Sequence, residues 1–284
     1  ELTGLDAGRC YVEIVPAPSG SETEVAVPAE PSDAKDDTSI GPRFADNFSF
    51  YEPMYFVVGP RVSLNAKFLL GFKYRLISAD SRLAEERPFW ERFFLGYTQT
   101  SLWDLGADSS PFIDTSYKPG LFYLDQYKGV RFLGLDFDSF EGGFRHESNG
   151  QGGDRSRSIN QLYIRPTFHY GPADDWHLAI VPRAWIYVGD LGDNPDIADY
   201  RGYVDLVLRF SHPEGFEVAA TLCKGTESGY GSVQLDLTYP LDRLFFGNLA
   251  AYLQFQYFNG WGETLLHYNE MYPTQYRIGI SLFR

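Results

Sequence analysis

Long hydrophobic runs are missing from this sequence of 284 residues. No stretch approaches the roughly 18 consecutive apolar residues that a membrane-spanning helix needs, so no transmembrane helix is expected. Clusters of Lys and Arg are also missing, and the net charge of −14 argues against binding to a nucleic-acid backbone. Methionine is scarce, with 2 residues, whereas Tyr, Phe and Gly number 20, 23 and 28, which favours strands and turns over helices.

Cysteine is nearly absent as well. Cys10 lies near the N-terminus and Cys223 lies inside a strand-like pattern, so the two could pair only in an oxidising compartment. We interpret them as two isolated thiols, while the alternative of a disulfide stays open at this stage.

The first 45 residues lack the periodic apolar positions of a folded element. Pro, Ser, Asp and Glu dominate residues 16–43, so this part cannot bury enough apolar surface to fold alone. We therefore predict a flexible, acidic, Pro-rich arm over residues 1–45 and a folded part over residues 46–284.

From about residue 47 onward, apolar and polar residues alternate with a period of two. Phe68 and Phe72, for example, share one parity, while Lys67 and Lys73 share the other. Similar alternation recurs in residues 178–188, 204–210, 233–239, 249–257 and 276–282. The pattern predicts an all-β chain with little helix and about twelve strand-like segments.

Alternation alone does not separate a soluble β-sandwich from a membrane barrel. Two features favour the barrel: strands of about ten residues span a bilayer at a tilt, and their polar faces combine Arg, Lys, Asp and Gln, as a lumen does. Aromatic residues also gather near strand ends, where an interfacial girdle is expected: Trp103, Trp176, Tyr187 and Trp261. We predict a twelve-stranded antiparallel transmembrane β-barrel, since closed bacterial barrels have an even number of strands.

The stretch over residues 142–166 carries the strongest indication of chemistry. His146 and Ser148 are two residues apart, which on a strand places both side chains on the same face. An imidazole there can take the serine proton and activate the oxygen as a nucleophile. Both residues share the parity of Phe144, so they should face lipid, where polar groups are costly unless they act on lipid.

Asn160 lies on the strand that returns from this loop. It shares the parity of Leu162 and Ile164, so a hairpin would bring its amide next to His146 on the outer face. A carboxamide can accept the imidazole N–H and fix its tautomer, as the third member of a triad does. Each such residue taken singly is more often a solvated loop residue, and their shared parity is what predicts a triad with Ser148.

These residues belong to a motif that resembles the bacterial outer-membrane phospholipase A family. The motif is matched by His146, Ser148, Asn149, Gly150, Ser156, Arg157, Ser158 and Asn160. The resemblance continues in residues 97–105, 109–112, 193–196, 228–231 and 259–269. It covers about residues 47–282 and leaves out the N-terminal arm.

The resemblance implies a twelve-stranded barrel of the bacterial outer membrane with its active site on the outer surface. The implied activity is hydrolysis of the acyl ester bonds of phospholipids, of A1 and A2 type. Ser148 would attack the ester carbonyl, His146 would remove its proton and Asn160 would orient His146. The backbone N–H of Gly150 would help to hold the oxyanion.

The resemblance also implies calcium as the cofactor and a homodimer as the active form. The implied ligands are the Ser156 hydroxyl and the Gln151 carbonyl, with the Ser109 carbonyl supplied by a second subunit, and calcium suits oxygen-only ligands. Where the family often has an aspartate near the metal, this chain has Gly153. The adjacent Asp154 either replaces that aspartate or only forms a turn.

Gln99 shares the parity of Leu95 and Tyr97 and should project into the lipid-facing band. An amide without a partner is costly in hydrocarbon, and a contact across a dimer interface would remove that cost. Gln99 matches the dimer-contact glutamine of the family, and the alternative is a side chain that reaches the lipid headgroups.

Two other functions stay open. A passive porin or adhesion barrel explains the alternation, the girdle and the acidity, but it does not explain His146, Ser148 and Asn160. A catalytically inactive family member that acts as a structural barrel is compatible with Gly153. The partners expected are phospholipid, the outer membrane and a second copy of the chain, and nucleic acid is not expected.

Overall fold

The computed structural model describes residues 40–60, 64–244 and 249–284. Residues 1–39 of the predicted arm and Cys10 lie outside these ranges. Residues 40–45, which we assigned to the end of that arm, belong to helix α1 (Ile40–Asn47). Cys223 is a free thiol. None of the helices in these ranges has the length and apolar character to cross a membrane.

Strands account for most of these residues. The strands are β1 (Phe48–Phe50), β2 (Met54–Pro60), β3 (Leu64–Arg75), β4 (Phe93–Asp104), β5 (Phe112–Phe132), β6 (Leu135–Ser148), β7 (Ser158–Tyr170), β8 (His177–Tyr187), β9 (Val204–Ser211), β10 (Glu217–Lys224), β11 (Gly231–Pro240), β12 (Tyr252–Trp261) and β13 (Met271–Phe283). Besides α1, the helices are α2 (Arg82–Glu86), α3 (Ile197–Arg201) and the single 3₁₀ turns η1 (Pro88–Arg92), η2 (Gly153–Arg155) and η3 (Leu241–Arg243).

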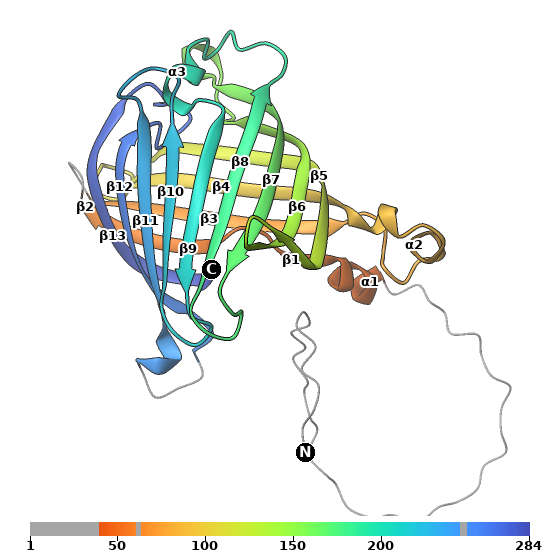
Figure 1. Ribbon diagram of the computed structural model, residues 1–284. Helices are drawn as coiled ribbons and strands as arrows, with labels where there is room; N and C mark the ends of the chain where they lie inside the picture. Colours follow the sequence, from red (N-terminus) through yellow and green to blue (C-terminus); the bar gives the residue numbers. More distant parts are fainter. Residues whose placement is uncertain (1–39, 61–63, 245–248) are drawn as a thin grey trace, which may run out of the picture. The chain divides into compact units, whose positions relative to one another are not determined.

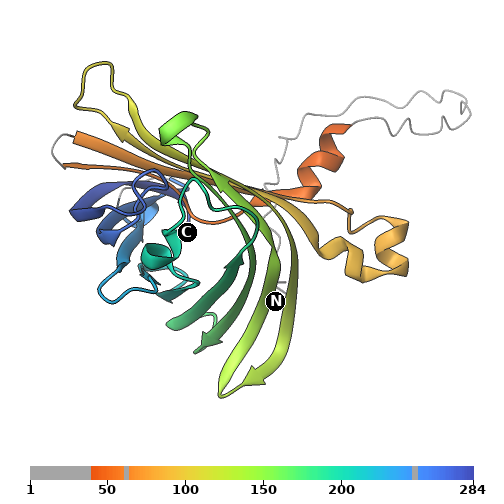
Figure 2. The same ribbon diagram turned by 90° about the horizontal axis from the view of Figure 1, so that it is seen from above.

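The strands β2 to β13, twelve within the described residues, form one closed antiparallel ring (Figure 1, Figure 2). Each pairs with the next along the chain, and β13 pairs with β2 to close the ring. The predicted twelve-stranded barrel is therefore confirmed. The short strand β1 is an addition that pairs with β3 beyond the end of β2, with Phe48 opposite Tyr74.

Alternation along the strands puts apolar side chains outside and polar ones inside. On β3, Leu70 and Phe72 are exposed, whereas Lys67 is buried. An exposed apolar belt of this kind is what a lipid-facing surface requires. Trp261 departs from the predicted girdle because it lines the lumen. A register shift in β12, where Gly260 has a φ of +127°, breaks the alternation just before it.

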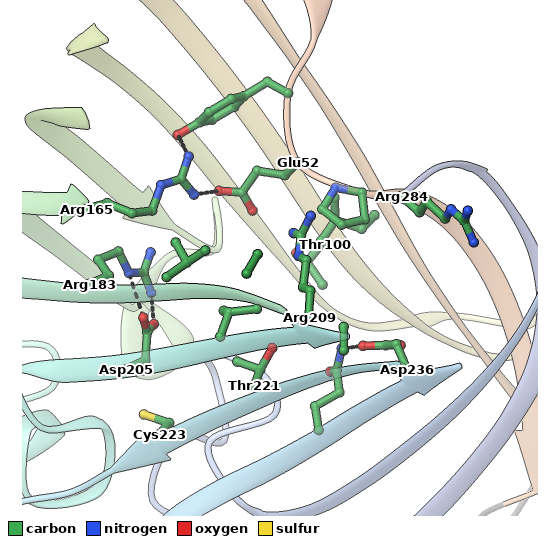
Figure 3. Close-up of a pocket in the computed structure, with 18 of the residues that line it drawn as sticks. Glu52, Thr100, Arg165, Arg183, Asp205, Arg209, Thr221, Cys223, Asp236 and Arg284 are labelled. Atoms are coloured by element: carbon green, nitrogen blue, oxygen red, sulfur yellow. Dashed lines mark hydrogen bonds and ion pairs between the residues drawn. The ribbon is translucent and has the colours of Figure 1, made fainter. Parts of the chain in front are cut away.

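Charged and amide side chains fill the lumen. Arg277 and Glu263, both with 0% side-chain exposure, approach to 2.6 Å, and Lys67 lies 3.2 Å from the same carboxylate. Arg183 pairs with Asp205 across β8 and β9 (Figure 3). A charge buried without a partner costs several kcal/mol, so these pairs hold the strands in register. A cavity of about 690 Å³ remains among them.

The two ends of the barrel are built differently. Because the strands alternate in direction, the connections β4–β5, β6–β7, β8–β9 and β12–β13 share one end, and α1 and α2 lie at the other (Figure 1). At the first end Ile159, Ile197, Leu265 and Tyr268 pack into an apolar group, which we call the loop cluster. The cluster joins β7 to two of the connections and supports the end of the barrel where β6 meets β7.

Candidate active site

The β6–β7 hairpin places His146, Ser148 and Asn160 on the outer face of the barrel. His146 lies directly opposite Asn160 in the strand register. Phe144 and Leu162, which share their parity, are 39% and 47% exposed. The parity argument therefore locates these polar side chains correctly, on the same face as the exposed Phe144 and Leu162.

A hydrogen bond joins two of the three residues. His146 Nδ1 lies 2.8 Å from Asn160 Oδ1. With the amide oxygen as acceptor, Nδ1 carries the ring hydrogen and Nε2 keeps its lone pair. Within the described ranges Ser148 Oγ has no side-chain hydrogen bond, so it is available to Nε2 of His146. In ligand-free proteins catalytic hydrogen bonds are often long and shorten when substrate binds.

Buried Asn149 fixes the start of the loop that follows Ser148. Its Oδ1 accepts hydrogen bonds from the backbone N–H groups of Gln151 and Arg157, at 3.3 and 3.1 Å. Its Nδ2 donates to the Arg155 carbonyl at 2.8 Å. One side chain therefore replaces the backbone bonds that the loop cannot make with a neighbouring strand.

Gly150 lies at a position where both the backbone conformation and the available space favour glycine. Its φ is +67°, in the left-handed region that favours glycine. A Cβ at this position would also lie 3.1 Å from the ring of Tyr117 on β5. A side chain here would strain the turn next to Ser148 and press against that ring.

Of the residues expected to bind metal, Ser156 has the most informative contact. Its hydroxyl donates a hydrogen bond to Asp193 Oδ2 at 2.7 Å. Gln151 Oε1 accepts from Arg155 Nε at 2.6 Å, so the side chain of Gln151 is engaged within the loop. A hydroxyl, a carbonyl and a carboxylate form an oxygen-only donor set of the kind that calcium prefers.

The other two expected ligands have few contacts. Asp154 is exposed, and its carboxylate makes no hydrogen bond or ion pair among residues 40–60, 64–244 and 249–284. Ser109 is exposed on the β4–β5 connection, at the same end of the barrel, with a φ of +61°. Those same ranges contain no group of three or more His, Cys, Asp or Glu side chains that could hold a metal.

Two residues of the β8–β9 connection contact this site without having been predicted to do so. Asp193 accepts from Ser156, and the side chain of buried Asn194 accepts from the Ser158 N–H at 3.1 Å. Both belong to the stretch 193–196, which sequence comparison marked only as part of a resemblance. Its density of acidic and turn-forming residues was the available signal.

Tyr268 connects the loop cluster to the same connection. Its hydroxyl hydrogen-bonds to Asp196. Burial, and then this contact, raise the pKa of Tyr268 above its ordinary value, so the hydroxyl stays protonated and keeps donating. Arg157 lies over its ring at 5.9 Å.

Gln99 lies on the outer face of β4 but is not without partners in its own chain. Its Oε1 accepts from the Tyr97 hydroxyl at 3.0 Å, and its Nε2 donates to Ser101 Oγ at 3.1 Å. The expectation of an amide without any partner was therefore wrong. One N–H and one lone pair of the amide remain for a further contact.

A single cross-strand row links Gln99 to Ser148. Gln99 is opposite Tyr117, and Tyr117 is opposite Ser148. Two strand spacings of about 4.8 Å therefore separate the two residues, roughly 10 Å along the outer surface. Anything that covers Gln99 also lies close to Ser148.

Sequence comparison gives a consistent result. The family model described as Phospholipase A1 matches residues 52–282. Phospholipase A1 of Escherichia coli (strain K12) is 32% identical over 246 residues, which are 82% of this chain and 79% of that protein. A relative from Neisseria meningitidis serogroup B is 35% identical over 215 residues, 72% of this chain and 52% of the relative. The chain thus spans about half the length of that relative.

Comparison with solved structures also finds outer membrane phospholipases. Outer membrane phospholipase A from Escherichia coli has a TM-score of 0.70 at 26% identity, covering 87% of this chain and 94% of that one. The Salmonella typhi outer membrane phospholipase, solved as a dimer with bound calcium, has a TM-score of 0.70 at 26% identity, with 83% and 92% covered. An active-site variant of the Escherichia coli protein, in which asparagine is replaced by alanine, has a TM-score of 0.69.

Proposed function

This chain belongs to the phospholipase A1 family, and we propose that it hydrolyses acyl ester bonds of phospholipids with a Ser148–His146–Asn160 triad. Like the outer membrane phospholipase A whose fold it shares, it is a β-barrel of the bacterial outer membrane. The observation that carries the proposal is the 2.8 Å contact between His146 and Asn160 on the outer, lipid-facing side of the hairpin. A passive barrel has no use for an oriented imidazole beside an unbonded serine there.

The proposed reaction proceeds in two halves. Ser148 Oγ attacks the ester carbonyl carbon while His146 Nε2 takes its proton, and the N–H of Gly150 stabilises the oxyanion. The imidazolium then returns the proton to the departing lysophospholipid oxygen, which leaves an acyl-enzyme. Water, activated by the same nitrogen, releases the fatty acid. Asn160 is neutral, so it holds the ring in place and stabilises the imidazolium less than a carboxylate would.

The residues around Ser156 fit a calcium site. We assign the Ser156 hydroxyl and the Gln151 carbonyl as ligands of one subunit, with the Ser109 carbonyl from the other. When bound, calcium supplies positive charge for the developing oxyanion. Asp193 contacts Ser156 directly, so it is a better acidic neighbour for the metal than Asp154.

The same proposal includes a homodimer with Gln99 at its centre. The free N–H and lone pair of Gln99 would meet their counterparts on a second copy across a two-fold axis. Because Gln99 and Ser148 lie on one row about 10 Å apart, the partner would form one wall of the substrate site. The Salmonella typhi relative crystallised as a dimer with calcium.

A lipid-hydrolysis assay tests the proposal. The purified barrel is mixed with phospholipid in detergent micelles, with calcium or with chelator, and free fatty acid is measured. We expect hydrolysis by the parent with calcium and none by Ser148→Ala. No hydrolysis by the folded parent would leave the inactive or porin-like barrel as the function, and hydrolysis by Ser148→Ala would reject this nucleophile.

A further inference from the structure

Glu147 lies between the proposed base and nucleophile but faces the lumen. It is 3% exposed, and Arg201 Nη1 lies 3.2 and 3.3 Å from its two oxygens. Lys118 Nζ approaches it to 4.0 Å. The end of β6 is therefore held by an ion pair on the side of the strand opposite to His146 and Ser148.

Arg201 connects this ion pair to the rest of the barrel end. It is the last residue of α3, and its Nη2 donates to the Gly262 carbonyl at 3.3 Å. Gly262 has a φ of +69°, and a Cβ there would lie 3.3 Å from Arg201 Nε. The guanidinium thus contacts both β6 and the β12–β13 connection, at the end of α3.

The connection that carries Arg201, residues 188–203, also contacts the loop between β6 and β7. Asp193 receives the hydrogen bond of Ser156, and Asn194 receives that of the Ser158 backbone. The same connection therefore contacts two parts of the proposed site. Asp193 and Asn194 contact the β6–β7 loop and the start of β7, and Arg201 contacts the end of β6.

We infer that Arg201 is a positioning residue, which acts through Glu147 to hold the end of β6 where His146 and Ser148 are competent for reaction. The inference rests on the proposed function. Without Arg201, the one ion pair that Glu147 keeps with the described residues is that with Lys118 at 4.0 Å, and the end of β6 loses its ion pair with residues 188–203. Misplacing a reacting group by about 1 Å can cost roughly 100-fold in rate.

The test compares folded variants for kcat and KM. Arg201→Met should lower kcat by about 10- to 100-fold with KM within about twofold, because the substrate surface is unchanged. Arg201→Lys should keep a higher kcat than Arg201→Met, since lysine retains the positive charge but not the planar guanidinium that reaches both Glu147 and Gly262. Glu147→Gln should lose a similar factor, and the double variant with Arg201→Met should lose no more than the worse single one.

Arg183→Met is the matched control. The Arg183–Asp205 pair is also lumenal, with side-chain exposures of 18% and 11% against 18% and 4% for Arg201 and Glu147, but it joins β8 to β9. Folding is checked by the heat-dependent gel shift of intact barrels. Arg183→Met should keep the parental kcat in its folded fraction. If Arg201→Met does not fold, Arg201→Lys and Glu147→Gln provide the comparison.

The possible failures are distinguishable. An active parent with folded Arg201 and Glu147 variants at parental kcat would overturn the inference alone. An equal loss in Arg183→Met would also overturn it, because the effect would then come from the lumen as a whole. A folded parent that hydrolyses no phospholipid would instead refute the proposed function.

Discussion

The outer face and the lumen of this barrel use polar residues in opposite ways. In the lumen, Glu263 lies within ion-pair distance of both Lys67 and Arg277. On the outer face, Ser148 Oγ has no side-chain partner in the described chain, and Gln99 keeps an unused N–H. Fully paired groups stabilise a fold, whereas groups left with bonding capacity are available to a ligand or a partner. Substitutions outside should therefore change activity, and substitutions inside should change stability, with the exception of the Arg201–Glu147 pair behind the catalytic strand.

Ser148→Ala tests the outer half of this comparison most severely. We expect hydrolysis to fall by at least about 10⁴-fold, since the covalent intermediate can no longer form. The unfolding temperature should stay within the error of the parent, because the side chain is outside the lumen. The measurements are fatty-acid release and thermal unfolding of the same preparation. A large loss of stability would contradict the division between the two faces.

His146→Ala and Asn160→Ala rank the two partners of Ser148. Loss of the base should cost nearly as much as loss of the nucleophile, while loss of Asn160 should cost about 10- to 100-fold. The reason is that Asn160 orients the ring but takes no proton. Steady-state kcat for both variants provides the check, and equal losses would count against the ranking.

Calcium removal and Gln99→Ala test whether the unused hydrogen-bonding groups and the proposed metal ligands of the outer face bind a second subunit. Chelation should leave nearly no activity, because it removes the positive charge that stabilises the oxyanion and the ion whose proposed ligands join two chains. One interhelical hydrogen bond in lipid contributes about 0.6 to 1.7 kcal/mol, and Gln99→Ala removes the two that a two-fold axis creates, so the dimer should weaken by roughly 8- to 300-fold. Crosslinked dimer and hydrolysis are measured across protein concentration. Full activity from a demonstrable monomer in chelator would reject the dimer mechanism.

Glu263→Gln should have the smallest effect on activity and a large one on stability. Breaking a buried pair by changing one partner costs about 3–5 kcal/mol. Burial opposes ionisation of Glu263, but Lys67 and Arg277 outweigh it and lower its pKa from the ordinary 4.5. Because the folded pKa is the lower one, the stabilisation is complete above the unfolded pKa and is lost as pH falls below it.

Unfolding in denaturant at a series of acidic pH values checks this. The parent should lose stability as pH falls from about 5 to 3, and Glu263→Gln should lose less over the same range. A variant with parental stability and parental pH dependence would show that the lumenal pair contributes nothing.

The sequence predicted the features that follow from counting along one strand. The contact between His146 and Asn160 follows from period-two alternation and one hairpin, so both its face and its partners could be anticipated. The contacts of Ser156 with Asp193 and of Glu147 with Arg201 join residues 37 and 54 positions apart. No period relates such residues, because the loops that carry them are shaped by packing in the loop cluster.

The wrong prediction for Trp261 has a different physical cause. Trp261 was assigned to the outer girdle because it lies near a strand end, and it lines the lumen because the register shifts near Gly260. Bulges are set by the pairing of both strands, so Gly260 indicates that a bulge can occur here but does not define the resulting shift in register. Gln99 was misjudged for another reason: Tyr97 was counted only as a neighbour of equal parity and Ser101 was not considered, although both lie on its face and hydrogen-bond to its amide.

The closure of the ring by β13 and β2 has a consequence for the order of folding. The hydrogen bond from Ser281 to the Met54 carbonyl joins residues 227 positions apart, whereas His146 and Asn160 are separated by 14. The entropy lost in closing a chain segment grows with its length, and distant contacts form slowly. The hairpin that carries the catalytic residues can therefore assemble early as a local unit. The seam between the first and last strands closes only when the entire barrel sequence is present, and the lumenal pairs of Arg277 form with it.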